Sequence, residues 1–147
     1  MRGCKQVLLS PVFLLPTSLL MSLEYQEIFV TLADPDGKSL IPFYQALFGI
    51  PPIVHIPEKY AEFQLARLRL SIFKPQSSQQ SQFQTMRGGS FSLCFVVEDL
   101  ETAIATLCKL GYPPQGELRM EHHGREIHAF DPLGNRLILY EKSGSYR

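Results

Sequence analysis

The sequence has no net charge, because its 14 lysine and arginine residues balance 14 acidic residues. Proteins that bind nucleic acid or anionic membranes usually carry a basic surface, so neither partner is expected here. The chain also lacks a disulfide framework, because Cys4, Cys94 and Cys108 lie far apart and cannot all pair. We therefore expect reduced, buried thiols in a cytoplasmic protein.

No apolar run is long enough to span a bilayer. The most apolar one, residues 7–20, contains Pro11 and Pro16 and is not followed by a small-residue cleavage site. We expect residues 1–22 to be a leader, either a disordered extension or the product of an upstream translation start. Residues 23–145 then have the length of one domain, which can bury a core without disulfide or metal staples.

An internal repeat organises this domain. Residues 27–49 and residues 92–111 contain the same three features in the same order. An alternating apolar segment is followed by an aspartate, Asp34 or Asp99, and then by a helical pattern that ends at glycine. Strand-like segments follow in each half, which predicts two β-α-β-β-β modules at about 24–75 and 90–142. A surface linker rich in Gln, Ser and Gly, residues 76–89, separates them. Each module must pack against the other to bury its apolar face.

Local signals predict where these elements begin and end. Alternation over Glu27–Leu32 predicts the first strand. Ser39 or Asp36 can cap the first helix, and Asp99 can cap the second. Gly49 is expected to end the first helix.

Several of these features resemble the glyoxalase/bleomycin resistance/dioxygenase superfamily, the vicinal oxygen chelate (VOC) fold. The features are the paired modules, the helix that contains Phe43-Tyr44 and ends at Leu47-Phe48-Gly49, and the turn at residues 131–135. The resemblance covers about residues 24–142. It implies an α+β fold in which two βαβββ modules form a curved mixed sheet around a central cup, and a homodimer whose cups include both subunits. It does not fix the chemistry, because this fold hosts isomerases, epimerases, lyases, ring-cleaving dioxygenases and drug-sequestering proteins.

In the metal-using members, each module supplies one ligand from its first strand and one from its last. The matching positions in this chain are Glu27, Ser71, Ser92 and Ile138. Isoleucine has no donor atom, and neutral serine hydroxyls are poor ligands for zinc, iron or nickel. The resemblance therefore implies a degenerate site, with no metal and no cofactor.

Without a metal, the cup is predicted to present a mixed polar and aromatic surface of the kind that binds small molecules. Arg69 could hold a carboxylate or phosphate, and aromatic residues could stack on a flat ring. The candidate ligand-binding residues are Glu27, Phe29, Arg69, Ser71, Phe73, Ser92, His128, Phe130, Ile138 and Tyr140. Thr31, Arg67, Cys94 and Arg136 are expected on the same face. Alternatively, Glu27 pairs with an arginine across the sheet and the rings fill a collapsed interior.

Three functions are compatible with this surface. The leading prediction is a metal-free protein that binds a small molecule in the cup. One alternative is a glyoxalase-type lyase or isomerase, with a relocated metal or with Glu27 and His128 as an acid–base pair. The other is a non-catalytic structural dimer with a filled cup.

Overall fold

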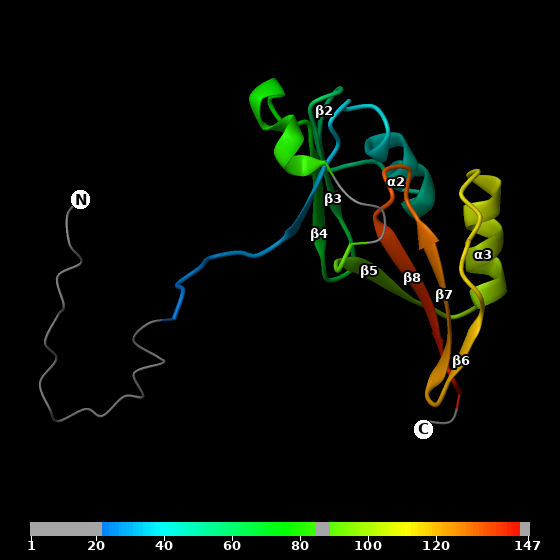
Figure 1. The fold of residues 1–147 in the computed structure, drawn as a ribbon. Helices are drawn as coiled ribbons and strands as arrows, with labels where there is room; N and C mark the ends of the chain where they lie inside the picture. The colour runs from blue at the N-terminus through cyan, green and yellow to red at the C-terminus, as the bar shows by residue number, and fades with distance from the viewer. Residues whose placement is uncertain (1–21, 85–88, 145–147) are drawn as a thin grey trace, which may run out of the picture.

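The computed structural model of the chain describes residues 22–84 and 89–144. The predicted leader therefore lies outside the described residues, apart from Ser22, and so do residues 85–88 of the predicted linker. The described elements follow the predicted order, two β-α-β-β-β modules, with a connection that contains a 3-10 helix between them (Figure 1).

The first module forms a four-stranded mixed sheet with strand order β1-β4-β3-β2. Its elements are β1 (Val30–Ala33), α2 (Leu40–Phe48), β2 (Val54–Ile56), β3 (Tyr60–Gln64) and β4 (Arg69–Phe73). Strand β1 runs parallel to β4, and the other neighbours are antiparallel.

The second module repeats this pattern with strand order β5-β8-β7-β6. Its elements are β5 (Ser92–Val97), α3 (Leu100–Lys109), β6 (Arg119–Glu121), β7 (Gly124–Phe130) and β8 (Arg136–Lys142). Here too the first strand is parallel to the last, β5 to β8. The predicted α+β fold of two βαβββ modules is thus confirmed.

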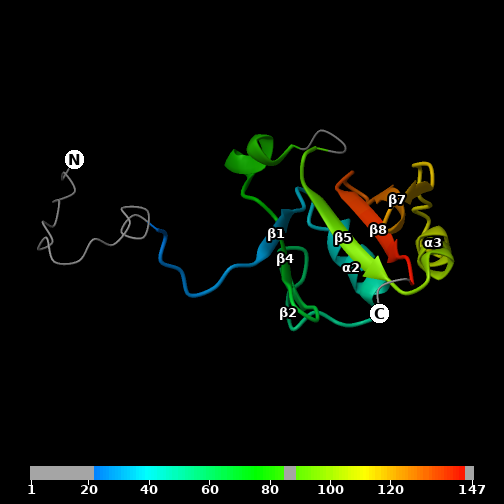
Figure 2. The same cartoon turned by 90° about the horizontal axis from the view of Figure 1, so that it is seen from below.

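Helix α2 packs against the apolar faces of both sheets. The ring of Phe48 lies 5.7 Å from that of Phe63 on β3 and 6.2 Å from that of Phe95 on β5. One hydrophobic core contains residues from both modules, and Figure 2 shows α2 between the first sheet and β8. Alternate strand residues point away from this core, so each sheet keeps an open face.

A buried hydrogen bond also joins the modules. The Tyr44 hydroxyl on α2 donates to Asp131, in the turn after β7, at 2.8 Å. Asp131 additionally accepts from the backbone N–H groups of Leu133 and Asn135 and from the Asn135 amide, so its carboxylate organises the turn. Burial and the adjacent Asp131 charge raise the pKa of Tyr44 above its usual range, so this residue stays a donor.

The first strand begins later than predicted. The alternation suggested Glu27–Leu32, whereas β1 covers Val30–Ala33. Strand β4 begins at Arg69, and Val30 pairs with Leu70. Residues 27 and 28 would therefore have to pair with the β3–β4 turn, which offers no strand.

The first helix is capped by Asp34, which is not one of the two residues predicted for this role. Asp34 accepts the backbone N–H groups of Ser39 and Leu40 at 2.9 and 2.8 Å, whereas the Ser39 side chain makes no capping bond. Asp36 instead accepts from Lys38 N–H and the Ser39 hydroxyl. Two other predictions are confirmed: Asp99 caps α3 through Thr102 N–H, and Gly49 ends α2 with a φ of 66°.

The described part of the predicted surface linker contains the 3-10 helix η1 (Ser77–Phe83), and Phe83 packs edge-on against Phe73 at 5.2 Å. One further expectation was wrong. Cys94 and Cys108 are free thiols, as expected, but both are exposed rather than buried. Cys94 lies on the open face of β5, where no helix covers it.

Candidate functional site

The open face of the first sheet carries a compact group of polar side chains. Strand pairing places Glu62 opposite Ser71, Gln64 opposite Arg69 and Tyr60 opposite Phe73. These residues alternate with Leu70 and Ile72, which are fully buried in the core. The predicted positions of Arg69, Ser71 and Phe73 on the face opposite the core therefore agree with the strand register.

Arg69 is the centre of this group. Its Nη1 lies 2.9 Å from a carboxylate oxygen of Glu27, and its Nε lies 4.0 Å from one of Glu62. Its guanidinium carbon stands 4.2 Å from the centre of the Phe29 ring, a cation–π contact. The structure thus brings together Glu27, Phe29 and Arg69, and the ion pair that the filled-cup alternative expects is present.

Two buried polar atoms beside this ion pair have no hydrogen-bond partner: the Ser71 hydroxyl oxygen and Arg69 Nε. Ser71 is only 1% exposed, although it lies on the side of the sheet opposite the core. The neighbouring Tyr60 hydroxyl donates to Glu62. That bond is the first cause that raises the pKa of Tyr60, ahead of burial. Unpaired buried polar groups are unusual in folded proteins, so each of these two atoms calls for an explanation.

The open face of the second sheet carries a separate group. Cys94, Ile138 and His128 lie side by side across β5, β8 and β7. His128 Nε2 is 3.4 Å from a carboxylate oxygen of Glu126, two residues along the same strand. Although Cys94 is exposed as a residue, the partial burial of its thiol, and then the charge of Glu126, raise the pKa of this thiol, which disfavours the thiolate.

The proposed acid–base pair is therefore divided between two sheets. Glu27 is paired with Arg69, whereas His128 is paired with Glu126. Tyr140 is also engaged, because its hydroxyl donates to the His123 carbonyl at 2.9 Å. Arg67 was expected on the inner face, but it lies exposed in the β3–β4 turn, outside both strands.

Strand pairing also changes one of the four positions matched to metal ligands. Ser92 pairs with Arg136, two residues before Ile138. Extending the register in which Val30 pairs with Leu70 by one residue puts Phe29, just before β1, at the equivalent position beside Arg69, two residues before Ser71. The four positions are thus Phe29, Ser71, Ser92 and Ile138, of which two have no donor atom and two offer neutral hydroxyls. This donor set does not fit zinc, iron or nickel.

Among the described residues, one group of three acidic side chains could bring oxygen ligands close together. It consists of Asp99, Glu101 and Glu141 at the start of α3. Arg125 already binds two of them, with contacts of 2.6 Å to Glu101 and 2.9 Å to Glu141. Because this guanidinium already occupies two of the three carboxylates, we interpret the group as a structural ion-pair network.

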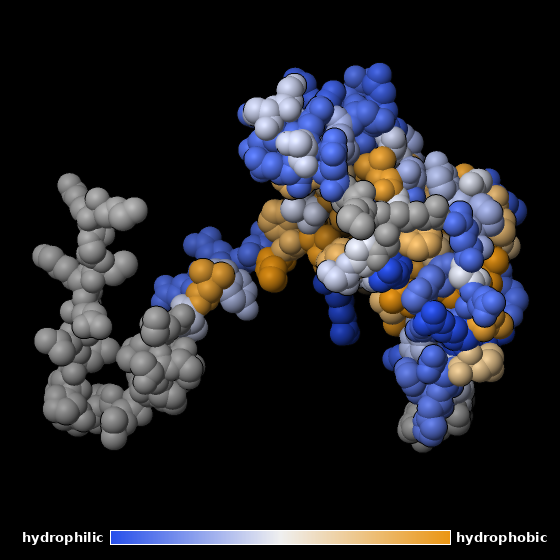
Figure 3. Space-filling view, in the orientation of Figure 1, coloured by the Kyte–Doolittle hydropathy of each residue, from blue (hydrophilic) through white to orange (hydrophobic). Residues whose placement is uncertain are grey.

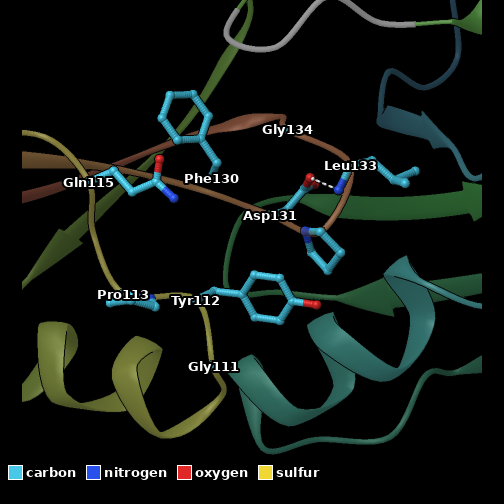
Figure 4. A pocket seen from close by; sticks show the side chains of 9 residues that line it. Gly111, Tyr112, Pro113, Gln115, Phe130, Asp131, Leu133 and Gly134 are labelled. Atoms are coloured by element: carbon cyan, nitrogen blue, oxygen red, sulfur yellow. Dashed lines mark hydrogen bonds between the residues drawn. The ribbon is translucent and has the colours of Figure 1, made fainter.

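The surface of the described part of the chain has several hollows. One of about 380 Å³ lies between the end of α3 and the β7–β8 turn, where Phe130 and Gln115 project and Asp131 accepts from Leu133 (Figure 4). Another of about 290 Å³ is bordered by Ser92 and Cys94 together with apolar residues of both modules. Phe130 and Ser92 thus border two different hollows.

Sequence reasoning missed Tyr60, Glu62 and Glu126 as site residues. Glu62 lies on the same face as Ser71, its partner across the strand pair. Glu126 lies on the same face as Ile138 and His128 of the second sheet. The alternation along β3 and β7 contains this signal, but only the register, which single-strand periodicity does not fix, makes it visible.

The sequence and the structure were compared with known proteins. Residues 28–139 match the family model described as the Glyoxalase/Bleomycin resistance protein/Dioxygenase superfamily. A comparison with curated proteins gave no match. No helix in the described part of the chain is long and apolar enough to cross a membrane.

Many solved structures share this fold. A lactoylglutathione lyase from Agrobacterium tumefaciens is 21% identical, with a TM-score of 0.60 over 80% of this chain and 95% of the other. A glyoxalase-related enzyme from Fulvimarina pelagi is 22% identical, with a TM-score of 0.63 over 80% and 89%. A glyoxalase/bleomycin resistance protein/dioxygenase from Nocardioides is 14% identical, with a TM-score of 0.66 over 89% and 93%. At these identities the likeness shows the fold alone.

Proposed function

Because this chain belongs to the glyoxalase/bleomycin resistance protein/dioxygenase superfamily, we propose that it is a metal-free cytoplasmic protein that binds a small organic molecule. The observation that carries this proposal is the donor set at the four positions matched to metal ligands. Phe29 and Ile138 cannot coordinate an ion, and the Ser71 and Ser92 hydroxyls do not compensate for them. The binding surface is the pair of open faces, where ionisable, hydroxyl and aromatic side chains lie together.

A homodimer would complete the cup. Within one chain, the open faces point away from a shared core, so a cup that uses both faces needs a second copy. Their charges favour such a pairing. The first face carries Arg69 against Glu27 and Glu62, one positive and two negative groups. The second carries three positive and two negative groups by strand alternation: Arg119, Arg136, Lys142, Glu121 and Glu126. Opposite charge balances favour contact between two faces.

Metal analysis of protein purified without chelators tests this proposal directly. We expect zinc, nickel, iron and manganese well below one ion per chain, and a metabolite panel in a thermal-shift assay should contain at least one stabilising compound. Stoichiometric metal would contradict the proposal. A metal-free protein that no compound stabilises would favour the structural dimer.

A glyoxalase-type lyase or isomerase is the second candidate, and one observation favours it. The His128 imidazole stands on an open face with its Nε2 3.4 Å from a Glu126 carboxylate oxygen, an arrangement that a general base can use. In the proposed dimer, Glu27 of one copy could approach His128 of the other. Turnover that disappears in a His128→Gln variant while the bound compound is retained would support this function.

A further inference from the structure

The polar group on the first sheet has a hydrogen-bonding pattern that selects a type of ligand. Resting on the proposed function, we propose that Glu62, Arg69 and Ser71 recognise a neutral carboxamide carried by a flat ring, and that residues 27–29 act as a strap over this site.

The gap between Arg69 and Glu62 is the first support. Arg69 Nε and the nearer Glu62 oxygen are 4.0 Å apart, too far for a direct hydrogen bond. The Nε–H is buried and unpaired. A carboxamide carries an acceptor and two donors side by side. Its oxygen can accept from Arg69 Nε–H while its NH₂ group donates to Glu62, so one ligand group joins both residues.

Ser71 supplies the third contact. Its hydroxyl is buried and unpaired, and strand pairing places it directly beside Glu62. A hydroxyl both donates and accepts, so it can complete the hydrogen bonding of the carboxamide. The Tyr60 hydroxyl holds Glu62 from the opposite side. This fixes the carboxylate as an acceptor facing the ligand.

The charges of the group favour a neutral ligand over a charged one. A carboxylate ligand would lie next to Glu62 and would compete with Glu27 for Arg69. A cationic ligand would lie next to the Arg69 guanidinium. Each would add an imperfectly paired charge to a partly buried site, which is costly. A carboxamide satisfies the same donors and acceptors without adding charge.

Residues 27–29 control access to these atoms. They belong to no strand, yet Glu27 binds Arg69 through its carboxylate and Phe29 lies over the guanidinium. The Glu27 side chain is 57% exposed, so water competes for this ion pair and it can open. Figure 3 shows apolar side chains along the extended segment that leads into β1, outside the compact body. The strap is thus held mainly by its contacts with Arg69.

Three probes of similar shape and different charge test this proposal: benzamide, benzoate and benzamidine. Each is titrated into the ¹⁵N-labelled full-length protein while the Arg69 Nε–H resonance is followed by NMR. We expect benzamide to shift this resonance and to bind at least about tenfold more tightly than either charged probe. Preferred binding of benzoate or benzamidine would overturn the proposal.

Variants separate the site from the strap. Ser71→Ala should weaken benzamide binding about three- to tenfold, the usual effect of one hydrogen bond. Ser77→Ala, which removes an exposed hydroxyl on η1, is the matched control and should change nothing. Glu27→Gln should strengthen benzamide binding, because the strap loses its ionic contact. Equal affinity in the wild type and in Ser71→Ala, with native spectra for both, would contradict the assignment.

The outcomes also distinguish this inference from the proposed function. If no probe binds, while a compound from the metabolite panel binds without shifting the Arg69 resonance, the inference is wrong and the proposed function stands. Stoichiometric metal in the purified protein would overturn the proposed function, whatever the probes show.

Discussion

The Tyr44 hydroxyl is the polar side-chain contact that links the first helix to the second module. It donates to Asp131 in the buried interior, and the same carboxylate holds the β7–β8 turn through three further bonds. A hydrogen bond between a neutral donor and a buried carboxylate contributes more than one at the surface.

Tyr44→Phe removes this hydroxyl and keeps the packed ring. We expect the free energy of unfolding to fall by about 1.5–3 kcal/mol, because the Asp131 oxygen that accepted from Tyr44 stays buried and loses one hydrogen-bond partner. Urea unfolding followed by circular dichroism measures the change. Tyr112→Phe is the matched control, since Tyr112 is 37% exposed and its ring packs on Phe43. It should change stability by less than about 0.5 kcal/mol, and equal losses in both variants would contradict this role for Tyr44.

Residue-level prediction from the sequence was better for the faces of strand residues than for their partners. Alternation placed Arg69, Ser71 and Ile138 opposite the core, and the strand register agrees, whereas Arg67 lies outside both strands. The pairing of Glu27 with an arginine was expected only as an alternative. The contacts of Phe29 with Arg69 and of Glu62 with Ser71 were not predicted, since they depend on side-chain direction and register. The sequence comparison also put Glu27, rather than Phe29, at the position equivalent to Ser92. The reason is that it counted residues back from Asp34 and did not follow the strand pairing.

At the scale of elements, a carboxylate accepts a backbone N–H group at the start of each helix, and these two carboxylates lie in contrasting surroundings. Asp34 caps α2 from a fully buried position, and burial is the main cause that raises its pKa. Glu141 of β8 accepts from Leu100 N–H at the start of α3 and pairs with Arg125 near the surface. These contacts, with Arg125 first, lower its pKa.

Asp34→Asn tests the buried cap through its pH dependence. The folded state holds a proton on Asp34 more tightly than the unfolded state, where the pKa is about 3.9. This contribution to stability is therefore full below that value and is lost as pH rises through the raised folded pKa. The Asp34→Asn variant keeps an acceptor for Leu40 N–H and does not titrate. We expect it to gain stability relative to the wild type as pH rises from 3 to 7, measured by urea midpoints; a constant difference would contradict the raised pKa.

Glu141→Gln should show the opposite slope. The contribution of Glu141 is full above its unfolded pKa of about 4.3 and is lost as pH falls through its lowered folded pKa. The wild type should therefore exceed Glu141→Gln in thermal midpoint at pH 7, and the gap should close in acid. Glu117→Gln, an exposed change in the loop before β6, is the control and should show no such gap. A gap that widens in acid would contradict the assigned cause.

Most element boundaries could be predicted because they depend on local signals. The positive φ of Gly49 and the Asp99 cap are properties of a few adjacent residues. The start of β1 could not, because it depends on where β4 begins, about forty residues later. The capping role of Asp34 was missed because its side chain reaches across the turn to residues five and six positions ahead.

At the scale of the whole molecule, the proposed cup requires two chains, and mixing variants tests this. Arg69→Met disables the first open face and His128→Ala disables the second. Each pure variant should lose the stabilising compound from the metabolite panel. After unfolding and refolding together in equal amounts, about a quarter of the cups should combine two intact faces and bind again. Recovery of no binding at all would show that each chain forms its site alone.

The position of α2 between the two sheets has a consequence for dissecting this protein. A cut between residues 84 and 89 would separate the halves while leaving both sheets and both helices whole. The N-terminal piece would then expose the Phe48 side of its helix, and the C-terminal piece would lose the cover over Phe95. Neither piece should hold a stable tertiary structure by itself, but equimolar mixing should restore near-ultraviolet circular dichroism, as two fragments of one cooperative unit do.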